Sequence, residues 1–194
     1  MFQKTLAVTD FYFGDKDFAF PMGCIQLMGK SNKDMLAGDA PSITPGSVLK
    51  GIAEHSIDWW LTGEDLPMPE NRVQVKNGQI HLEYTENNLE GFNRLKDVWE
   101  ETLKTIYDQH RFFPHSLYLK KNIPIEGVAH QCGTLRFGTD PRNTVLDVNC
   151  RTHEIENLYV VDGSFFPSSA AVNPSLTIIA NALRVGKHLV ENVL

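Results

Sequence analysis

The sequence of 194 residues lacks several features that would identify its class at once. It has only three cysteines, Cys24, Cys132 and Cys150, an odd number that is too low for a disulfide-stabilised scaffold. No apolar stretch approaches the roughly 18–20 residues of a membrane span, and the N-terminus lacks the basic-then-apolar pattern of a secretory signal. We therefore expect reduced thiols and a cytoplasmic location, with a periplasmic location as the alternative if a signal lies upstream.

Common ligand-binding and nucleophile motifs are also missing. The chain contains no Gly-x-Gly-x-x-Gly, no P-loop and no Gly-x-Ser-x-Gly. It has no run of Lys or Arg, and its net charge of -6 argues against a nucleic-acid-binding surface. What remains is the composition of a globular protein, 42% hydrophobic and 22% charged, which predicts one or two domains with a buried core.

The first half of the chain predicts strands more than helices. Turn formers dominate residues 1–50, where we expect short extended segments. These lie at residues 5–8, 11–13 and 24–28. Further on, the alternating runs 72–75 and 80–84 flank Asn77-Gly78, which is the strongest short-range signal for a β-hairpin. Apolar residues then recur at helical spacing over 89–107, which predicts an amphipathic helix.

The last third has a different order. Residues 145–148 predict a short strand, and the apolar run 158–161 predicts a buried strand that stops at Asp162-Gly163-Ser164. A long helix is predicted over 175–193. The fold class we expect is α+β, with an antiparallel-sheet domain and covering helices over residues 1–128. Residues 129–194 would add the terminal strand, turn and helix of an α/β domain that is otherwise missing.

The start of the last predicted helix allows two interpretations. Asn173 is of a type favoured at the N-cap, and Pro174 suits the first helical position, so the pair can be a well-made helix start and nothing more. The alternative is that the free N–H groups of this helix N-terminus face an anion. Asp162 and Gly163 are ambiguous in the same way, because they suit an ordinary turn and also the ligand-binding edge of a sheet.

His130 stands in a polar loop flanked by glycine, where a neutral imidazole is suited to act as a general base. An isolated loop histidine is also often inert. A third interpretation is a zinc site, because His130 and Cys132, with Cys150 and His153, offer two cysteines and two histidines as ligands.

Several segments of the last third resemble the closing block of the glucose–methanol–choline (GMC) family of FAD-dependent oxidoreductases. They match it in order and spacing, and they are the run from His130 to Gly138, Asp140-Pro141, Val145-Leu146-Asp147, the run from Asn157 to Ser164, Pro167, and the run from Asn173 to Thr177. Upstream, Glu64-Asp65-Leu66-Pro67 and the run from Pro69 to Val73 resemble the start of the family's substrate-domain sheet.

The resemblance implies a role for each candidate residue. His130 would take the hydroxyl proton of an alcohol or sugar while hydride passes to FAD, and Asn173 would be the second catalytic residue. Asp162 and Gly163 would lie on the pyrophosphate–ribityl side of FAD. The helix start formed by Asn173, Pro174 and Ser175 would lie near the flavin pyrimidine edge, and no metal is implied.

The family's Gly-rich FAD-binding unit has no counterpart in this sequence. We therefore expect a C-terminal fragment whose partner is the missing N-terminal FAD-binding segment, inactive on its own and prone to form homo-oligomers. The alternative is a non-catalytic fragment or subunit that acts only through protein association.

Overall fold

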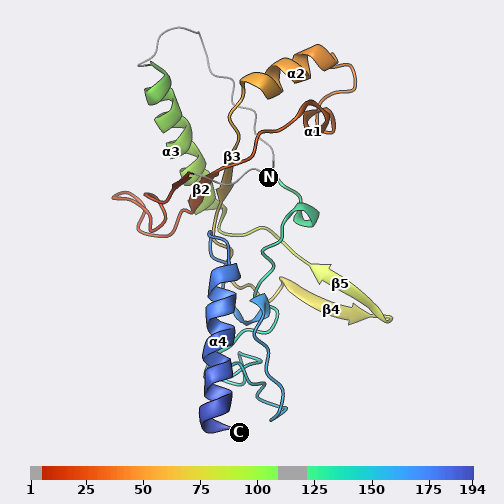
Figure 1. Cartoon of the computed structure of the whole chain (residues 1–194), viewed down its shortest axis with the longest axis vertical. Coiled ribbons are helices and arrows are strands. Elements are labelled where there is room, and N and C mark those ends of the chain that lie inside the picture. Colours follow the sequence, from red (N-terminus) through yellow and green to blue (C-terminus); the bar gives the residue numbers. More distant parts are fainter. Residues whose placement is uncertain (1–5, 109–121) are drawn as a thin grey trace.

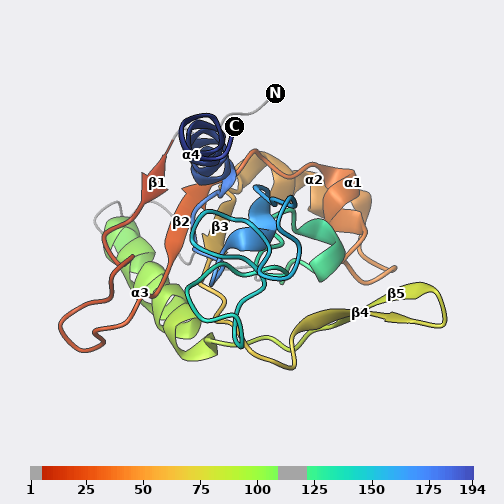
Figure 2. The same ribbon diagram turned by 90° about the horizontal axis from the view of Figure 1, so that it is seen from below.

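The computed structural model describes residues 6–108 and 122–194 of the chain (Figure 1). A three-stranded antiparallel sheet lies in the first half, in the order β1 (Ala7–Val8), β2 (Cys24–Leu27) and β3 (Trp59–Thr62). The helix α3 (Leu89–Asp108) contacts β3 and lies alongside this sheet (Figure 2). Its residues Leu95 and Trp99 join Met22 and Ile25 in one buried cluster. The predicted amphipathic helix is thus confirmed, and it covers the sheet.

Two helices of the first half were not predicted. They are α1 (Lys33–Ala37) and α2 (Gly46–His55), and they pack on each other in a region where we expected turns and extended segments. Both are short and lie among Gly and Pro residues, so their periodicity is hard to distinguish from a loop. The expected extended segment at 11–13 is a turn, with the N–H of Tyr12 bonded to the carbonyl of Thr9 at 3.0 Å.

The predicted hairpin is confirmed as β4 (Arg72–Lys76) and β5 (Gln79–Glu83), which project from the rest of the molecule (Figure 1). Asn77 and Gly78 form the turn with φ of 53° and 76°, the left-handed values that a type I′ turn requires. On one face of the hairpin, Glu83 bonds Arg72 at 2.9 Å and Lys76 at 2.6 Å. The opposite face is apolar and exposed, and it consists of Val73, Val75, Ile80 and Leu82.

The last third, from residue 122, has a core of its own. Leu146, Cys150, Phe165 and Val185 are buried together. The strand expected at 158–161 is not an extended strand, because Tyr159 makes a single bridge to Arg151. Leu158 is exposed, contrary to our expectation of a buried strand. The segment 145–148 also forms only isolated bridges, both through Leu146.

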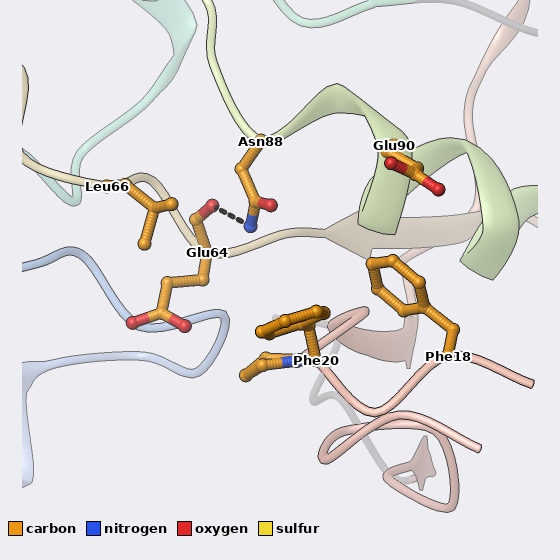
Figure 3. A pocket seen from close by; sticks show the side chains of 7 residues that line it. Phe18, Phe20, Glu64, Leu66, Asn88 and Glu90 are labelled. Carbon is orange, nitrogen blue, oxygen red and sulfur yellow. Dashed lines mark hydrogen bonds between the residues drawn. The ribbon is translucent and has the colours of Figure 1, made fainter. Parts of the chain in front are cut away.

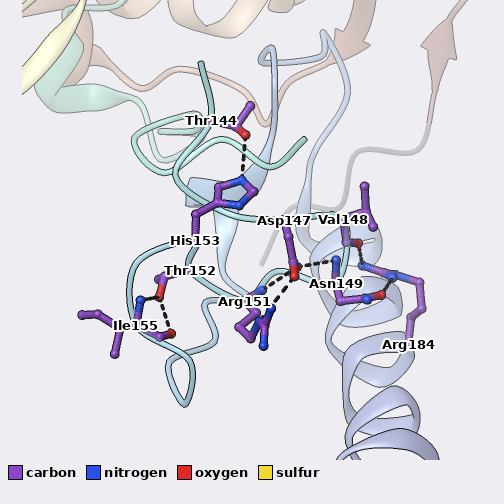
Figure 4. A network of polar contacts seen from close by, with 9 residues as sticks. All are labelled: Thr144, Asp147, Val148, Asn149, Arg151, Thr152, His153, Ile155 and Arg184. Carbon is purple, nitrogen blue, oxygen red and sulfur yellow. Dashed lines mark hydrogen bonds and ion pairs between the residues drawn. The ribbon is translucent and has the colours of Figure 1, made fainter. Parts of the chain in front are cut away.

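Polar contacts hold this irregular region together (Figure 4). The carboxylate of Asp147 accepts hydrogen bonds from the backbone N–H groups of Asn149 at 2.8 Å and Arg151 at 3.0 Å. Arg184 of the last helix donates to the carbonyl of Val148 at 2.9 Å. Hydrogen bonds within turns and this contact with the helix therefore take the place of the two strands that we expected in this region.

The last helix, α4 (Ser175–Asn192), has apolar residues on two sides. Ile178, Val185 and Leu189 face the core of the last third. The other side carries four exposed apolar residues, namely Leu176 (80% exposed), Ile179 (57%), Leu183 (71%) and Val190 (71%). We call these four residues the outer stripe of α4. Within the described residues, none of the helices has the length and apolar character to cross a membrane.

Candidate active site

The segment that follows His130 lies against the turn that begins at Gly163. The N–H of Gly133 donates to the carbonyl of Gly163 at 3.3 Å, and the N–H of Leu135 donates to that of Ser164 at 3.0 Å. A Cβ atom on Gly163 would lie only 3.1 Å from the carbonyl oxygen of Gln131. Glycine thus permits a close approach between the His130 segment and this turn, two candidate regions that are far apart in sequence.

The start of α4 reaches the same place. A Cβ on Gly163 would lie 3.6 Å from the Ile178 side chain and 3.8 Å from the Cys132 sulfur. Burial raises the pKa of the Cys132 thiol above its usual value, more than hydrogen bonding with Ser169, in the segment that leads to Asn173, lowers it. A raised pKa makes the reactive thiolate form of Cys132 less accessible. His130 itself is half-buried.

Asn173 is exposed and does not cap α4. The N-cap position is Pro174, whose ring has no group that could accept a hydrogen bond from the helix start. The first helical bond runs from the N–H of Ile178 to the carbonyl of Pro174 at 3.0 Å. By its hydrogen bonds α4 begins one position later than we predicted, while the backbone of Pro174 already has helical dihedral angles of φ -83° and ψ -14°. The backbone N–H groups at the start of α4 have no side-chain cap, so they are free to bind an anion.

Asp162 has a local structural role. It is the N-cap of the short 3-10 helix Gly163–Phe165, and its carboxylate accepts a hydrogen bond from the N–H of Ser164 at 2.8 Å. Hydrogen bonds from the side chain and backbone of Ser164 hold the pKa of the Asp162 carboxyl below its usual value. The exposed carboxylate is thus kept ionised beside Gly163.

The residues of the zinc alternative have other partners. Cys150 is buried, and its sulfur accepts a hydrogen bond from Asn181 at 3.3 Å. The ring of His153 is bonded to the Thr144 hydroxyl at 3.1 Å (Figure 4). Across residues 6–108 and 122–194, no three His, Cys, Asp or Glu side chains are grouped so as to hold a metal ion.

Sequence reasoning missed the residues that join the two halves of the molecule. Asp65, just after β3, forms an antiparallel bridge with Ser169, and Glu64 accepts a hydrogen bond from the Ser168 hydroxyl at 2.7 Å. Glu64 also lines a cavity of about 300 Å³ together with aromatic and polar side chains (Figure 3). The bonded residues are about a hundred positions apart, so no local pattern could have paired them.

Comparison with known proteins identifies the family. The sequence model described as GMC oxidoreductase, for the C-terminal part of these proteins, matches residues 79–182, more than half of the chain. The chain belongs to the GMC oxidoreductase family. The confirmed fold is α+β with small antiparallel sheets and several helices, as expected for this part of a family member.

Two curated relatives match almost the whole chain. Paromamine 6'-oxidase of Streptomyces fradiae is 30% identical over 193 residues, which cover 95% of this chain and 32% of the relative. The large subunit of fructose dehydrogenase from Gluconobacter japonicus is 26% identical over 196 residues, which cover 93% of this chain and 35% of the relative. A shorter match, 43% over 68 residues, is to 6'''-hydroxyparomomycin C oxidase of Streptomyces lividus, covering 35% of this chain and 12% of the relative. The chain thus spans about a third of the length of the relatives that it matches throughout.

Proposed function

We propose that this chain forms the substrate-binding and catalytic part of a flavin-dependent oxidoreductase that oxidises an alcohol or sugar hydroxyl. The observation that carries the proposal is the close approach of the His130 segment to Gly163 and to the start of α4. Relatives named as a paromamine oxidase, a fructose dehydrogenase and long-chain-alcohol oxidases support this reaction class.

His130 is the general base of this proposal, and Asn173 is its catalytic companion. Oxidation of an alcohol requires removal of the hydroxyl proton as the C–H bond breaks, and a neutral imidazole accepts such a proton near neutral pH. The Asn173 side chain is exposed and makes no cap bond, so its amide is available to donate to the reacting oxygen.

The described residues also fit FAD, the cofactor of the family. Gly163 permits the close packing of the His130 segment, and the uncapped N–H groups after Asn173 and Pro174, the first of them on Ser175, would favour the negatively charged edge of the cofactor. Asp162 would lie on the pyrophosphate–ribityl side. When bound, FAD supplies the hydride acceptor for the oxidation.

We further propose that residues 1–128 and 129–194 belong to two domains. The two buried clusters support this division, because all members of each cluster fall on one side of residue 128. The outer stripe of α4 would pack against the FAD-binding part, with which this chain would act. The same stripe favours the second candidate function, a non-catalytic subunit that acts only through protein association.

Replacement of His130 separates the two candidates. In the flavin-loaded protein, His130→Ala should slow flavin reduction by about 10²–10⁴-fold, the usual loss for a general base. Stopped-flow absorbance of the flavin measures this rate, and the flavin content should stay close to that of the parent protein.

His81→Ala is the matched control, because His81 lies on the exposed hairpin strand β5. It should reduce flavin at the parent rate. Reduction of His130→Ala at the parent rate would remove His130 from the mechanism and leave the non-catalytic subunit as the better explanation.

A further inference from the structure

The segment 168–172, which leads directly to Asn173, is bonded to the end of β3. Asp65 and Ser169 exchange two backbone hydrogen bonds, each of 3.0 Å. Beside them the Ser168 hydroxyl donates to the Glu64 carboxylate at 2.7 Å, an ordinary length for an O–H···O hydrogen bond. The backbone of Glu64 is itself held, because the Asn88 side chain donates to its carbonyl at 2.8 Å (Figure 3).

The opposite side of this segment contacts the His130 loop and the first turn of the chain. Ser169 lies close enough to Cys132, two residues after His130, to lower the pKa of its thiol. Ala171 is 3% exposed, and its backbone lies close enough to Tyr12 to lower the pKa of the phenol slightly. Burial, and after it the negative charge of Glu64, raise the pKa of Tyr12 above its usual value, so Tyr12 and Glu64 lie close to the same stretch of backbone. One short segment therefore joins the sheet of the first half to both candidate catalytic residues.

From these contacts we infer that Glu64 is a positioning residue that fixes Asn173 relative to His130 by holding Ser168. The inference rests on the proposed function, since it assigns these two residues to the reaction. The backbone pair of Asp65 and Ser169 joins the two halves at one point, and the side-chain bond of Glu64 restrains the segment at a second point. Two points fix the direction in which the chain continues towards Asn173. Because a displacement of about 1 Å at a reacting group can cost roughly 10²-fold in rate, this restraint matters for catalysis.

Glu64→Ala and Ser168→Ala each remove the bond, and Glu64→Gln retains the acceptor oxygen. We expect Glu64→Ala and Ser168→Ala to lower the rate of flavin reduction by roughly 10-fold, within the loss that a small displacement produces. The double variant should be no slower than either single variant, because the two residues act through one bond. Glu64→Gln should recover at least half of the parent rate, and substrate affinity should change by less than about twofold in all of them.

Hydrogen exchange supplies a readout that does not depend on activity. In the 194-residue chain, the amides of residues 168–173 should exchange faster in Glu64→Ala than in the parent, and Glu64→Gln should restore slow exchange. Glu70→Ala is the matched control, since Glu70 is an exposed carboxylate of the nearby loop, and it should change neither rate.

The outcomes separate this inference from the proposed function. An unchanged rate in His130→Ala removes the proposed function whatever Glu64 does. A slow His130→Ala together with parent-like reduction and exchange in Glu64→Ala overturns the positioning role alone. A weaker substrate affinity with an unchanged rate at saturation also overturns it, because Glu64 would then be a substrate contact in the adjoining cavity.

Discussion

The helices α3 and α4 present their apolar residues in different ways. α3 buries Leu95 and Trp99 against the sheet, and its outward side carries charged residues such as the ion pair of Arg94 and Glu90 at 3.0 Å. α4 buries Val185 on one side and leaves its outer stripe exposed on the other. A surface helix has one apolar face, whereas a helix that is apolar on two sides is typical of an interior position. α3 therefore has one buried apolar side, and α4 has a second apolar side that the described residues leave exposed.

The largest expected effect comes from the buried side of α3. Leu95 is fully buried in the first core, so Leu95→Ala should lower the free energy of unfolding by roughly 2–5 kcal/mol. Val185→Ala removes less volume from the second core and should cost about 2 kcal/mol. Urea unfolding followed by tryptophan fluorescence and by circular dichroism measures both changes.

The two probes also test whether the helices belong to separate units. All three tryptophans lie within residues 1–128, and the rings of Trp59 and Trp99 are 4.8 Å apart in the first core. Val185→Ala should therefore shift the dichroism transition and leave the tryptophan transition in place. Equal shifts of both transitions would mean that the two cores unfold as one cooperative unit, and the contrast between α3 and α4 would weaken.

The elements that sequence predicted correctly are those whose signal is local. Asn77-Gly78 imposes its own turn, and α3 and α4 are long enough for a helical period to stand out. α1 and α2 are too short for that. The run 158–161 has strand composition, but its neighbours provide a single bridge and not a ladder, so tertiary context decided its structure.

The candidate site was predictable only in part for the same reason. Their residue types and local context made His130 and Asn173 candidates, but only the resemblance to a family linked them in one site, because their spacing alone does not bring them together. The bond between Glu64 and Ser168 joins residues that share no motif and meet only after both halves have folded. The sequence of α4 shows apolar residues on both sides of the helix, but periodicity does not say which side this chain covers.

The outer stripe of α4 gives a smaller change in stability. Leu183 is 71% exposed and glutamine has nearly the same helix propensity as leucine, so Leu183→Gln should change the free energy of unfolding by less than about 0.5 kcal/mol. It should nevertheless weaken self-association of the chain, measured by sedimentation velocity over a range of concentrations. Lys187→Gln, an exposed position of the same helix, should leave association unchanged. A loss of more than 1 kcal/mol in Leu183→Gln would show that α4 is already packed on both sides.

The smallest change in stability is expected at the start of α4, where α1 provides a matched control. The Asn32 side chain caps α1 by accepting from the N–H groups of Asp34 at 3.0 Å and Met35 at 2.9 Å. Asn32→Ala should therefore cost roughly 0.5–2 kcal/mol. Asn173 makes no cap bond, so Asn173→Ala should change the free energy of unfolding by only a few tenths of a kcal/mol, as at other surface positions.

The rate of flavin reduction should change in the opposite order, with a larger effect of Asn173→Ala than of Asn32→Ala. Loss of an amide that donates to the reacting oxygen should slow reduction in Asn173→Ala by roughly 10²–10³-fold, while Asn32→Ala should reduce flavin at the parent rate. Thermal unfolding and stopped-flow reduction of the same two preparations give both quantities. If Asn173→Ala lost stability like Asn32→Ala and kept the parent rate, Asn173 would be a helix cap after all. Its place in the proposed reaction would then fall, while the contrast between the buried side of α4 and its outer stripe would stand.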